Sequence, residues 1–250
     1  MKILHAAETI KGGVATVMKQ ISASQLNHKG IERLICIIPD SQRNELDCIP
    51  DENIVTFKRK RRNIRAFLHF FFVFICQVWN EKPDVVHLHS TFSGVFGRIA
   101  LILLSPLRRT KVIYCPHAFS FLMESSKLKK KIYIIIEKIL LNATDKVICV
   151  SNYEYQEAVK SGLNSNKLVT IHNGVPAKIY KKKLARNEKI KLLFVGRFDY
   201  QKGYDLLIKA FQQCCKQSFH LTIVGDRVNE NTDRVNLDNV TYTGWLASRD

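Results

Sequence analysis

The stretch LLFVGRFDYQKGYDLL, residues 192–207, predicts a strand, a glycine-containing loop and the start of a helix. Its first four residues form a short apolar run that is typical of a fully buried parallel strand. The apolar residues after the loop have the spacing of one buried helix face: Leu206, Leu207, Ala210 and Phe211. In open α/β sheets, ligands bind where such strands end and helices begin. This stretch therefore predicts a parallel α/β sheet with a binding edge at Gly196.

The loop of this stretch carries two full positive charges, Arg197 and Lys202, between Gly196 and Gly203. The amino end of the following helix adds free N–H groups and the positive end of the helix dipole. Together these groups suit a diphosphate. The alternative is two solvated basic residues beside a tight turn, since the whole chain is rich in lysine and arginine. These residues alone leave both interpretations open.

The net charge of the 250-residue chain is +17, from 39 Lys and Arg against 22 Asp and Glu. Such a field favours an anionic partner: nucleic acid, an acidic membrane surface or a phosphorylated substrate. No helix-turn-helix, RNP-like or zinc pattern supports nucleic acid, so we expect none. The seven cysteines include no C-x-x-C and are odd in number, which favours reduced thiols in a cytoplasmic protein.

A basic and aromatic segment, Lys58 to Trp79, is the most lipid-like part of the chain. Its apolar portion, Ala66 to Trp79, is 14 residues long and too short to span a bilayer. One interpretation is a helix that rests on anionic lipid headgroups, which would make the protein peripheral at the inner face of the cytoplasmic membrane. The other is a buried helix of an α/β layer that follows a solvated basic lead-in.

The first half of the chain alternates strands and helices, which predicts a parallel sheet with helices on both faces. A strand over Met1 to Ala7 leads into Gly12 and Gly13, which open a helix. A glycine pair at this junction lets the backbone approach a ligand closely. The pattern is not G-x-G-x-x-G, so a nicotinamide cofactor is disfavoured.

Three histidines end two of the expected strands. His87 and His89 share one face of the strand 84–89, but we find no third ligand and therefore predict no metal site. His117 follows the strand 111–115, at the edge where ligands bind. It is placed to bond a polar substrate or exchange a proton. The alternative is a rim histidine bonded to a backbone carbonyl.

The chain divides into two expected domains. Residues 1–177 form an N-terminal Rossmann-like domain, and the basic stretch 178–190 is a linker. Residues 191–250 begin a second Rossmann-like domain with three strands and one clear helix, which is about half of a doubly wound domain. The fold class is α/β with parallel sheets, the second incomplete.

Taken in order, these motifs resemble glycosyltransferase family 4, whose members have two Rossmann-type domains in the GT-B arrangement. The matching features are Gly12-Gly13, Pro83 to Ser90, His117, Val150-Ser151, Asn173-Gly174-Val175, Gly196-Arg197 and Lys202-Gly203. The resemblance implies a retaining transfer of a sugar from a UDP- or GDP-linked donor to a glycan or lipid-linked glycan, in capsule, O-antigen or exopolysaccharide synthesis. It implies neither cofactor nor metal, and no D-x-D motif occurs.

The resemblance also implies roles for individual residues. Arg197 and Lys202 would hold the donor diphosphate and, with His117, form the catalytic set. His117 would contact the transferred sugar. The remaining donor-binding residues would be Gly12, Gly13, Asn173, Gly174 and Gly196.

Two departures from the family pattern stand out. Pro176 replaces the acidic residue that commonly follows Asn-Gly-Val. The family's E-x7-E element, whose glutamates bind the donor, would fall beyond Asp250, so we expect a C-terminally truncated enzyme with an incomplete donor site and doubtful activity of its own. The competing expectation is a non-catalytic basic protein that binds a membrane surface or nucleic acid.

Overall fold

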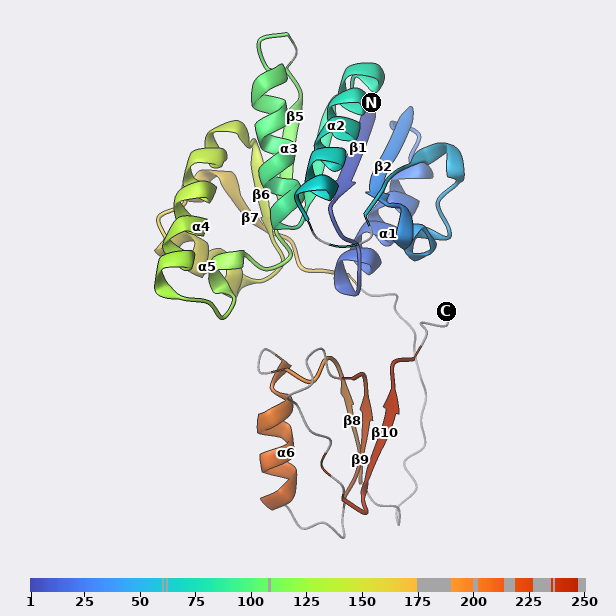
Figure 1. Cartoon of the computed structure of the whole chain (residues 1–250), viewed down its shortest axis with the longest axis vertical. Helices are drawn as coiled ribbons and strands as arrows, with labels where there is room; N and C mark the ends of the chain where they lie inside the picture. Colours follow the sequence, from blue (N-terminus) through green and yellow to red (C-terminus); the bar gives the residue numbers. More distant parts are fainter. Residues whose placement is uncertain are drawn as a thin grey trace. The chain divides into compact units, whose positions relative to one another are not determined.

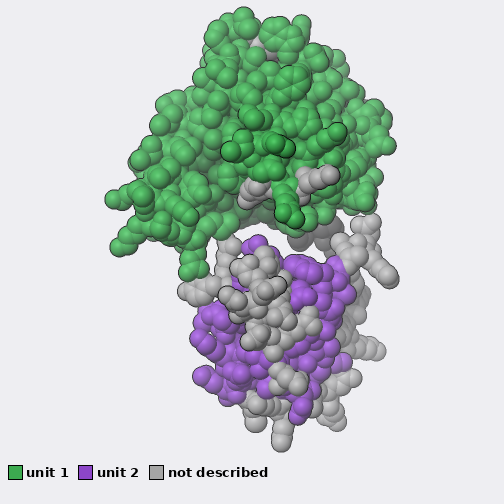
Figure 2. Space-filling view, in the orientation of Figure 1, with its two compact units in different colours: residues 1–176 green, residues 177–250 purple. Residues whose placement is uncertain are grey.

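The computed structural model describes residues 1–59, 61, 63–107, 109–174, 190–199, 202–213, 219–226, 235 and 237–246. The chain consists of two compact units, Met1–Pro176 and Ala177–Asp250 (Figures 1 and 2). The predicted linker, 178–190, lies outside the described residues apart from Ile190.

The first unit contains a seven-stranded sheet of order β3-β2-β1-β4-β5-β6-β7 (Figure 1). Every neighbouring pair in it is parallel. Its strands are β1 (Lys2–Ala7), β2 (Arg33–Pro39), β3 (Ile54–Phe57), β4 (Val85–His89), β5 (Lys111–Cys115), β6 (Lys146–Cys149) and β7 (Leu168–Thr170). Its α-helices are α1 (Gly13–Leu26), α2 (Ile64–Glu81), α3 (Thr91–Leu104), α4 (Lys127–Leu140) and α5 (Asn152–Lys160). The predicted parallel α/β class is confirmed.

Helices cover both faces of this sheet because its central strands are apolar on both sides. Successive side chains of a strand point to opposite faces. Leu4 and Ala6 therefore join the core that includes α2 and α3, whereas Ile3 and Ala7 join a second core that includes α1. The carboxyl ends of the parallel strands lie at one edge, where the polar loops gather.

The second unit contains a parallel sheet of order β10-β9-β8 and one described helix. The elements are β8 (Ile190–Val195), α6 (Tyr204–Gln213), β9 (Phe219–Val224) and β10 (Val240–Gly244). The expectation that β8 is fully buried is wrong, because β8 is an edge strand of the described sheet and most of it is exposed.

The predicted buried face of α6 is also wrong in part. Leu206 is 61% exposed and Ala210 is exposed as well, whereas the buried residues of α6 are Tyr204, Ile208 and Phe211. Tyr204 stacks on Phe198, with ring centroids 4.3 Å apart and 8° between the ring planes. This contact fixes the rotation of α6 and turns Leu206 outward.

None of the described helices is long and apolar enough to cross a membrane. The cysteines that the structure describes are free thiols: Cys36, Cys48, Cys76, Cys115 and Cys149.

Candidate functional site

The turn from β1 into α1 is an open stretch of backbone. Gly12 has φ 67° and ψ −133°, a conformation that L side chains rarely adopt, which explains the glycine there. Gly12 and Gly13 are exposed, and a Cβ on either would meet nothing within 4 Å. The amino end of α1 is therefore open to solvent at these two glycines, and such a helix terminus suits an anion.

The loop after β5 holds His117 in a strained conformation. His117 and Ala118 have φ of 54° and 100°, which is costly for residues other than glycine. Glu154 fixes the loop, because its Oε1 accepts hydrogen bonds from the backbone N–H groups of Ala118 (3.0 Å) and Phe119 (3.1 Å). Its Oε2 accepts another from Val150, at 2.7 Å.

Glu154 lies in the first turn of α5, whose N-cap is Ser151. The hydroxyl of Ser151 accepts a hydrogen bond from the backbone N–H of Glu154 at 3.1 Å. The carboxylate of Glu154 bridges the loop after β5 and the loop after β6. Burial raises the pKa of Glu154, although its three backbone donors oppose this shift. Sequence reasoning missed this positioning residue for His117.

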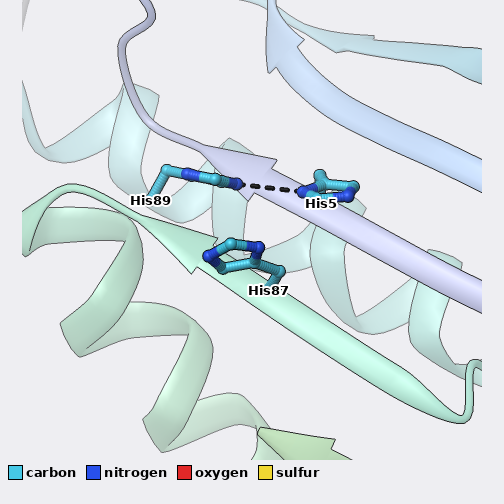
Figure 3. Close-up of side chains that lie close together, drawn as sticks. All are labelled: His5, His87 and His89. Atoms are coloured by element: carbon cyan, nitrogen blue, oxygen red, sulfur yellow. Dashed lines mark hydrogen bonds between the residues drawn. The ribbon is translucent and has the colours of Figure 1, made fainter. Parts of the chain in front are cut away.

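Three buried histidines from the neighbouring strands β1 and β4 lie close together (Figure 3). His87 and His89 come from β4, and the third, His5, comes from β1, where it pairs in register with His87. One ring nitrogen from each lies within 4.8 Å of the others. The expectation that no third imidazole accompanies the pair is therefore wrong; the strand register, which the sequence does not show, brings His5 beside them.

The histidines continue as a hydrogen-bonded chain to the surface. His5 Nε2 lies 2.6 Å from Gln25 Oε1, His5 Nδ1 lies 2.9 Å from His89 Nε2, and His89 Nδ1 lies 3.0 Å from His117 Nε2. A carbonyl oxygen only accepts, so His5 Nε2 carries the proton next to Gln25. If each ring is neutral, His89 Nε2–H donates to His5 Nδ1, and His117 Nε2–H donates to His89 Nδ1. The Nδ1 atom of His117 is then left as an acceptor.

Burial supports neutral rings along this chain. Burial lowers the pKa of His5 to about 4, although the hydrogen bond that His5 donates to Gln25 opposes this shift, and burial lowers the pKa of His117 to about 4. It lowers the pKa of His87 and His89 well below the ordinary range, and the neighbouring histidines add to that shift. These four histidines therefore carry no positive charge at neutral pH.

The ligand set of His5, His87 and His89 has the chemistry that zinc accepts, three neutral imidazole nitrogens. His87 Nε2 is buried and has no hydrogen-bond partner among the described residues. His5 and His89, however, already bond each other with the nitrogens that would face an ion. The expectation of no metal stays a prediction.

The described residues at the carboxyl end of β8, 196–199 and 202–203, include the basic side chains of Arg197 and Lys202. The N–H of Gly196 donates to the carbonyl of Val224 at 2.9 Å, and that of Phe198 donates to Asp226 at 3.1 Å. A Cβ on Gly225, whose φ is 127°, would collide with the Gly196 carbonyl. These contacts fix the backbone before α6.

Asp199 organises the charged side of this loop. Arg197 Nε lies 3.1 Å from Asp199 Oδ2, and the backbone N–H of Lys202 donates to Asp199 Oδ1 at 2.9 Å. The side chain of Arg197 remains 43% exposed, and Lys202 is exposed. The loop thus gathers Arg197 and Lys202 just before α6, as predicted, with Asp199 as a support that sequence reasoning missed.

The predicted residues fall into separate groups. Gly12 and His117 lie in loops that follow strands of the first unit, Gly13 is the first residue of α1, and Asn173 and Gly174 are exposed beyond β7. Gly196, Arg197 and Lys202 lie in the second unit. Two parallel α/β units with glycine-containing turns at their ligand-binding edges define the class of doubly wound ligand-binding proteins.

The sequence profile of Glycosyltransferase Family 4 matches residues 11–178, and that of Glycosyl transferases group 1 matches residues 177–250. The chain belongs to glycosyltransferase family 4. The family prediction and the GT-B-like fold class, with an incomplete second domain, are confirmed.

The similar proteins include relatives whose names refer to the cps region and to O-antigen biosynthesis. It is 38% identical over 260 residues to an uncharacterized 41.2 kDa protein in the cps region of Klebsiella pneumoniae, covering 100% of this chain and 70% of the relative. It is 32% identical over 142 residues to the Escherichia coli O-antigen biosynthesis glycosyltransferase WbnH, covering 56% of this chain and 39% of WbnH. Anabaena Alr3699/HepE, solved in complex with UDP, is similar in fold, with a TM-score of 0.72, 17% identity, and coverage of 99% of this chain and 70% of that one.

Proposed function

We propose that this protein transfers a sugar from a nucleotide-sugar donor to a glycan acceptor during synthesis of a bacterial surface polysaccharide. The observation that carries the proposal is the pair of basic residues before α6, Arg197 and Lys202, which Asp199 contacts, in a member of this family. The cps-region and O-antigen relatives support the polysaccharide context.

In this proposal the loop stabilises the leaving group. Negative charge develops on the departing diphosphate as the bond to the sugar breaks. Lys202, the Asp199-supported Arg197 and the amino end of α6 oppose that charge, and the loss of one such contact commonly costs about 3 kcal/mol. The donor is UDP- or GDP-linked, and we propose transfer with retention of configuration.

His117 has a separate role at the edge of the first unit. Its Nδ1, left as an acceptor by the histidine chain, suits a hydroxyl group of the sugar. The open backbone at Gly12 and Gly13 suits the donor phosphates. Asn173 and Gly174 are proposed to shape the donor site, and neither a cofactor nor a metal ion is required.

A transfer assay tests the proposal. The purified chain is incubated with a panel of UDP- and GDP-sugars and a lipid-linked oligosaccharide, and nucleoside diphosphate release is measured with and without acceptor. We expect release of nucleoside diphosphate that depends on the acceptor. Arg197→Ala should abolish this release, whereas Lys209→Ala, at an exposed position on α6, should preserve it. NMR of the product reports the anomeric configuration. Equal release by both variants would contradict the site assignment, and an inverted product would contradict retention.

A further inference from the structure

The solvent side of α4 is apolar. Leu128, Ile132, Ile135 and Ile139 follow the spacing i, i+4, i+7, i+11 and are 46–69% exposed. The opposite side holds the buried Glu137 and Leu140. A surface helix of a soluble domain ordinarily directs its polar residues outward. These four residues are the α4 stripe.

The neighbouring helices continue this surface. α3 packs between α2 and α4 (Figure 1). Trp79 of α2 and Leu104 of α3 line one small hollow, and Ile102 of α3 and Ile139 of α4 line another of about 620 Å³. The exposed apolar residues on α2 and α3 are Ile64, Leu68, Phe72, Trp79, Ile99, Ile102 and Leu103. With the α4 stripe they form the outer apolar face.

Scattered exposed apolar residues are normal, but a contiguous apolar surface across three helices marks an interaction site. The sequence left open whether the segment Lys58 to Trp79 is buried or lies against lipid. The structure divides it: Phe70 and Phe74 are buried, while Leu68 and Phe72 are 63% and 66% exposed.

The exposed charges on these three helices are predominantly positive. Exposed basic residues lie at the amino ends of α2 and α4 and in the last turn of α4: Arg61, Arg65, Lys127, Lys129, Lys131 and Lys138. The three helices contain only two acidic residues. Glu81 pairs with Arg33 at 3.4 Å, and Glu137 is buried against Arg98 at 2.8 Å. A uniformly anionic partner therefore complements the face.

We propose that the outer apolar face docks on an anionic lipid membrane surface, with the α4 stripe in the headgroup region and the flanking lysines on lipid phosphates. A second copy of the chain fits less well. A two-fold contact sets the same patch against itself, and here it would oppose lysines with lysines and offer no exposed acid. The proposal goes beyond sugar transfer and is tested without it.

A lipid-binding experiment with one tryptophan tests this docking. The chain contains two tryptophans, and Trp245→Phe leaves Trp79 on the outer apolar face as the sole reporter. The protein is mixed with phosphatidylglycerol–phosphatidylcholine vesicles with and without brominated acyl chains. We expect a blue shift of Trp79 emission on binding and quenching by the brominated lipid. Vesicle binding without either change would overturn the proposal, because the protein would bind through another surface.

Matched variants separate specific docking from general attraction of a cationic protein. Ile132→Gln with Ile135→Gln is expected to weaken vesicle binding about tenfold, while Leu206→Gln, 61% exposed on α6, leaves it unchanged. Lys131→Gln is expected to weaken binding about fivefold, and Lys209→Gln much less. Circular dichroism checks that each variant is folded.

Two results would overturn the proposal. One is equal vesicle affinity of the Ile132→Gln/Ile135→Gln variant and the unchanged protein. The other is a dimer in sedimentation equilibrium that these substitutions dissociate, without vesicle binding, which would assign the face to contact between copies.

Discussion

Acidification is expected to destabilise the first unit, because its four buried or partly buried histidines are neutral when it is folded. Unfolded histidine has a pKa of 6.5, whereas burial lowers those of His5 and His117 to about 4. Between these values the unfolded chain binds more protons than the folded one, so stability falls as the pH falls. The stabilising contribution is complete above pH 6.5 and is lost as the pH approaches 4.

The size of the effect follows from these two pKa values. From pH 8 to pH 5, each of His5 and His117 costs about 2 kcal/mol, or about 4 kcal/mol together. Burial lowers the pKa of His87 and His89 too, so they act in the same direction. Glu154 acts in the opposite direction, because burial raises its pKa. A loss of about 4 kcal/mol is a large part of a typical stability of about 5–15 kcal/mol.

Urea unfolding at pH 8, 6.5 and 5 measures this dependence, with Trp79 fluorescence of the Trp245→Phe variant as the probe of the first unit. We expect the free energy of unfolding to fall most steeply below pH 6.5. His5→Gln should reduce the difference in the free energy of unfolding between pH 8 and pH 5 by about 2 kcal/mol. His28→Gln, at an exposed position that is not one of the hydrogen-bonded histidines, should not reduce it. Stability that is constant from pH 8 to pH 5, or equal effects of the two variants, would refute the reasoning.

Three substitutions test the packing that supports the site, each by chemical denaturation. Glu137→Leu leaves Arg98 buried without its ion pair and should cost about 3–5 kcal/mol, much of which Arg98→Met should restore in the double variant. Glu154→Ala leaves buried N–H groups around the His117 loop without an acceptor and should cost about 1–3 kcal/mol. Gly94→Ala drives a methyl group into the Tyr114 ring and should cost about 1–3 kcal/mol. Changes below about 0.5 kcal/mol would contradict these assignments.

The alternation of strands and helices was predictable, because a strand buried on both faces must be apolar throughout. β2 shows this directly: six of its seven residues are buried. The loop with Arg197 and Lys202 was predictable as well, because local spacing alone places a strand, a glycine and a helix in order.

The histidine chain was not predictable, because it depends on contacts between distant strands. His5 and His87 are partners in the register of β1 and β4, and no local pattern encodes that pairing. The outward face of α2 was hidden for a different reason. A helix that is apolar almost all round gives no periodic signal to show which stripe is buried.

Nucleotide binding by the second unit is the most direct test of the central claim. Isothermal titration of UDP and GDP into the chain is compared among the unchanged protein, Arg197→Met and Lys209→Met. We predict that one nucleotide binds and that Arg197→Met weakens its Kd about 10- to 100-fold, as the loss of a charged hydrogen bond implies, while Lys209→Met does not. The claim would be contradicted if neither UDP nor GDP bound. It would also be contradicted if the Arg197→Met variant and the unchanged protein bound the nucleotide with equal affinity.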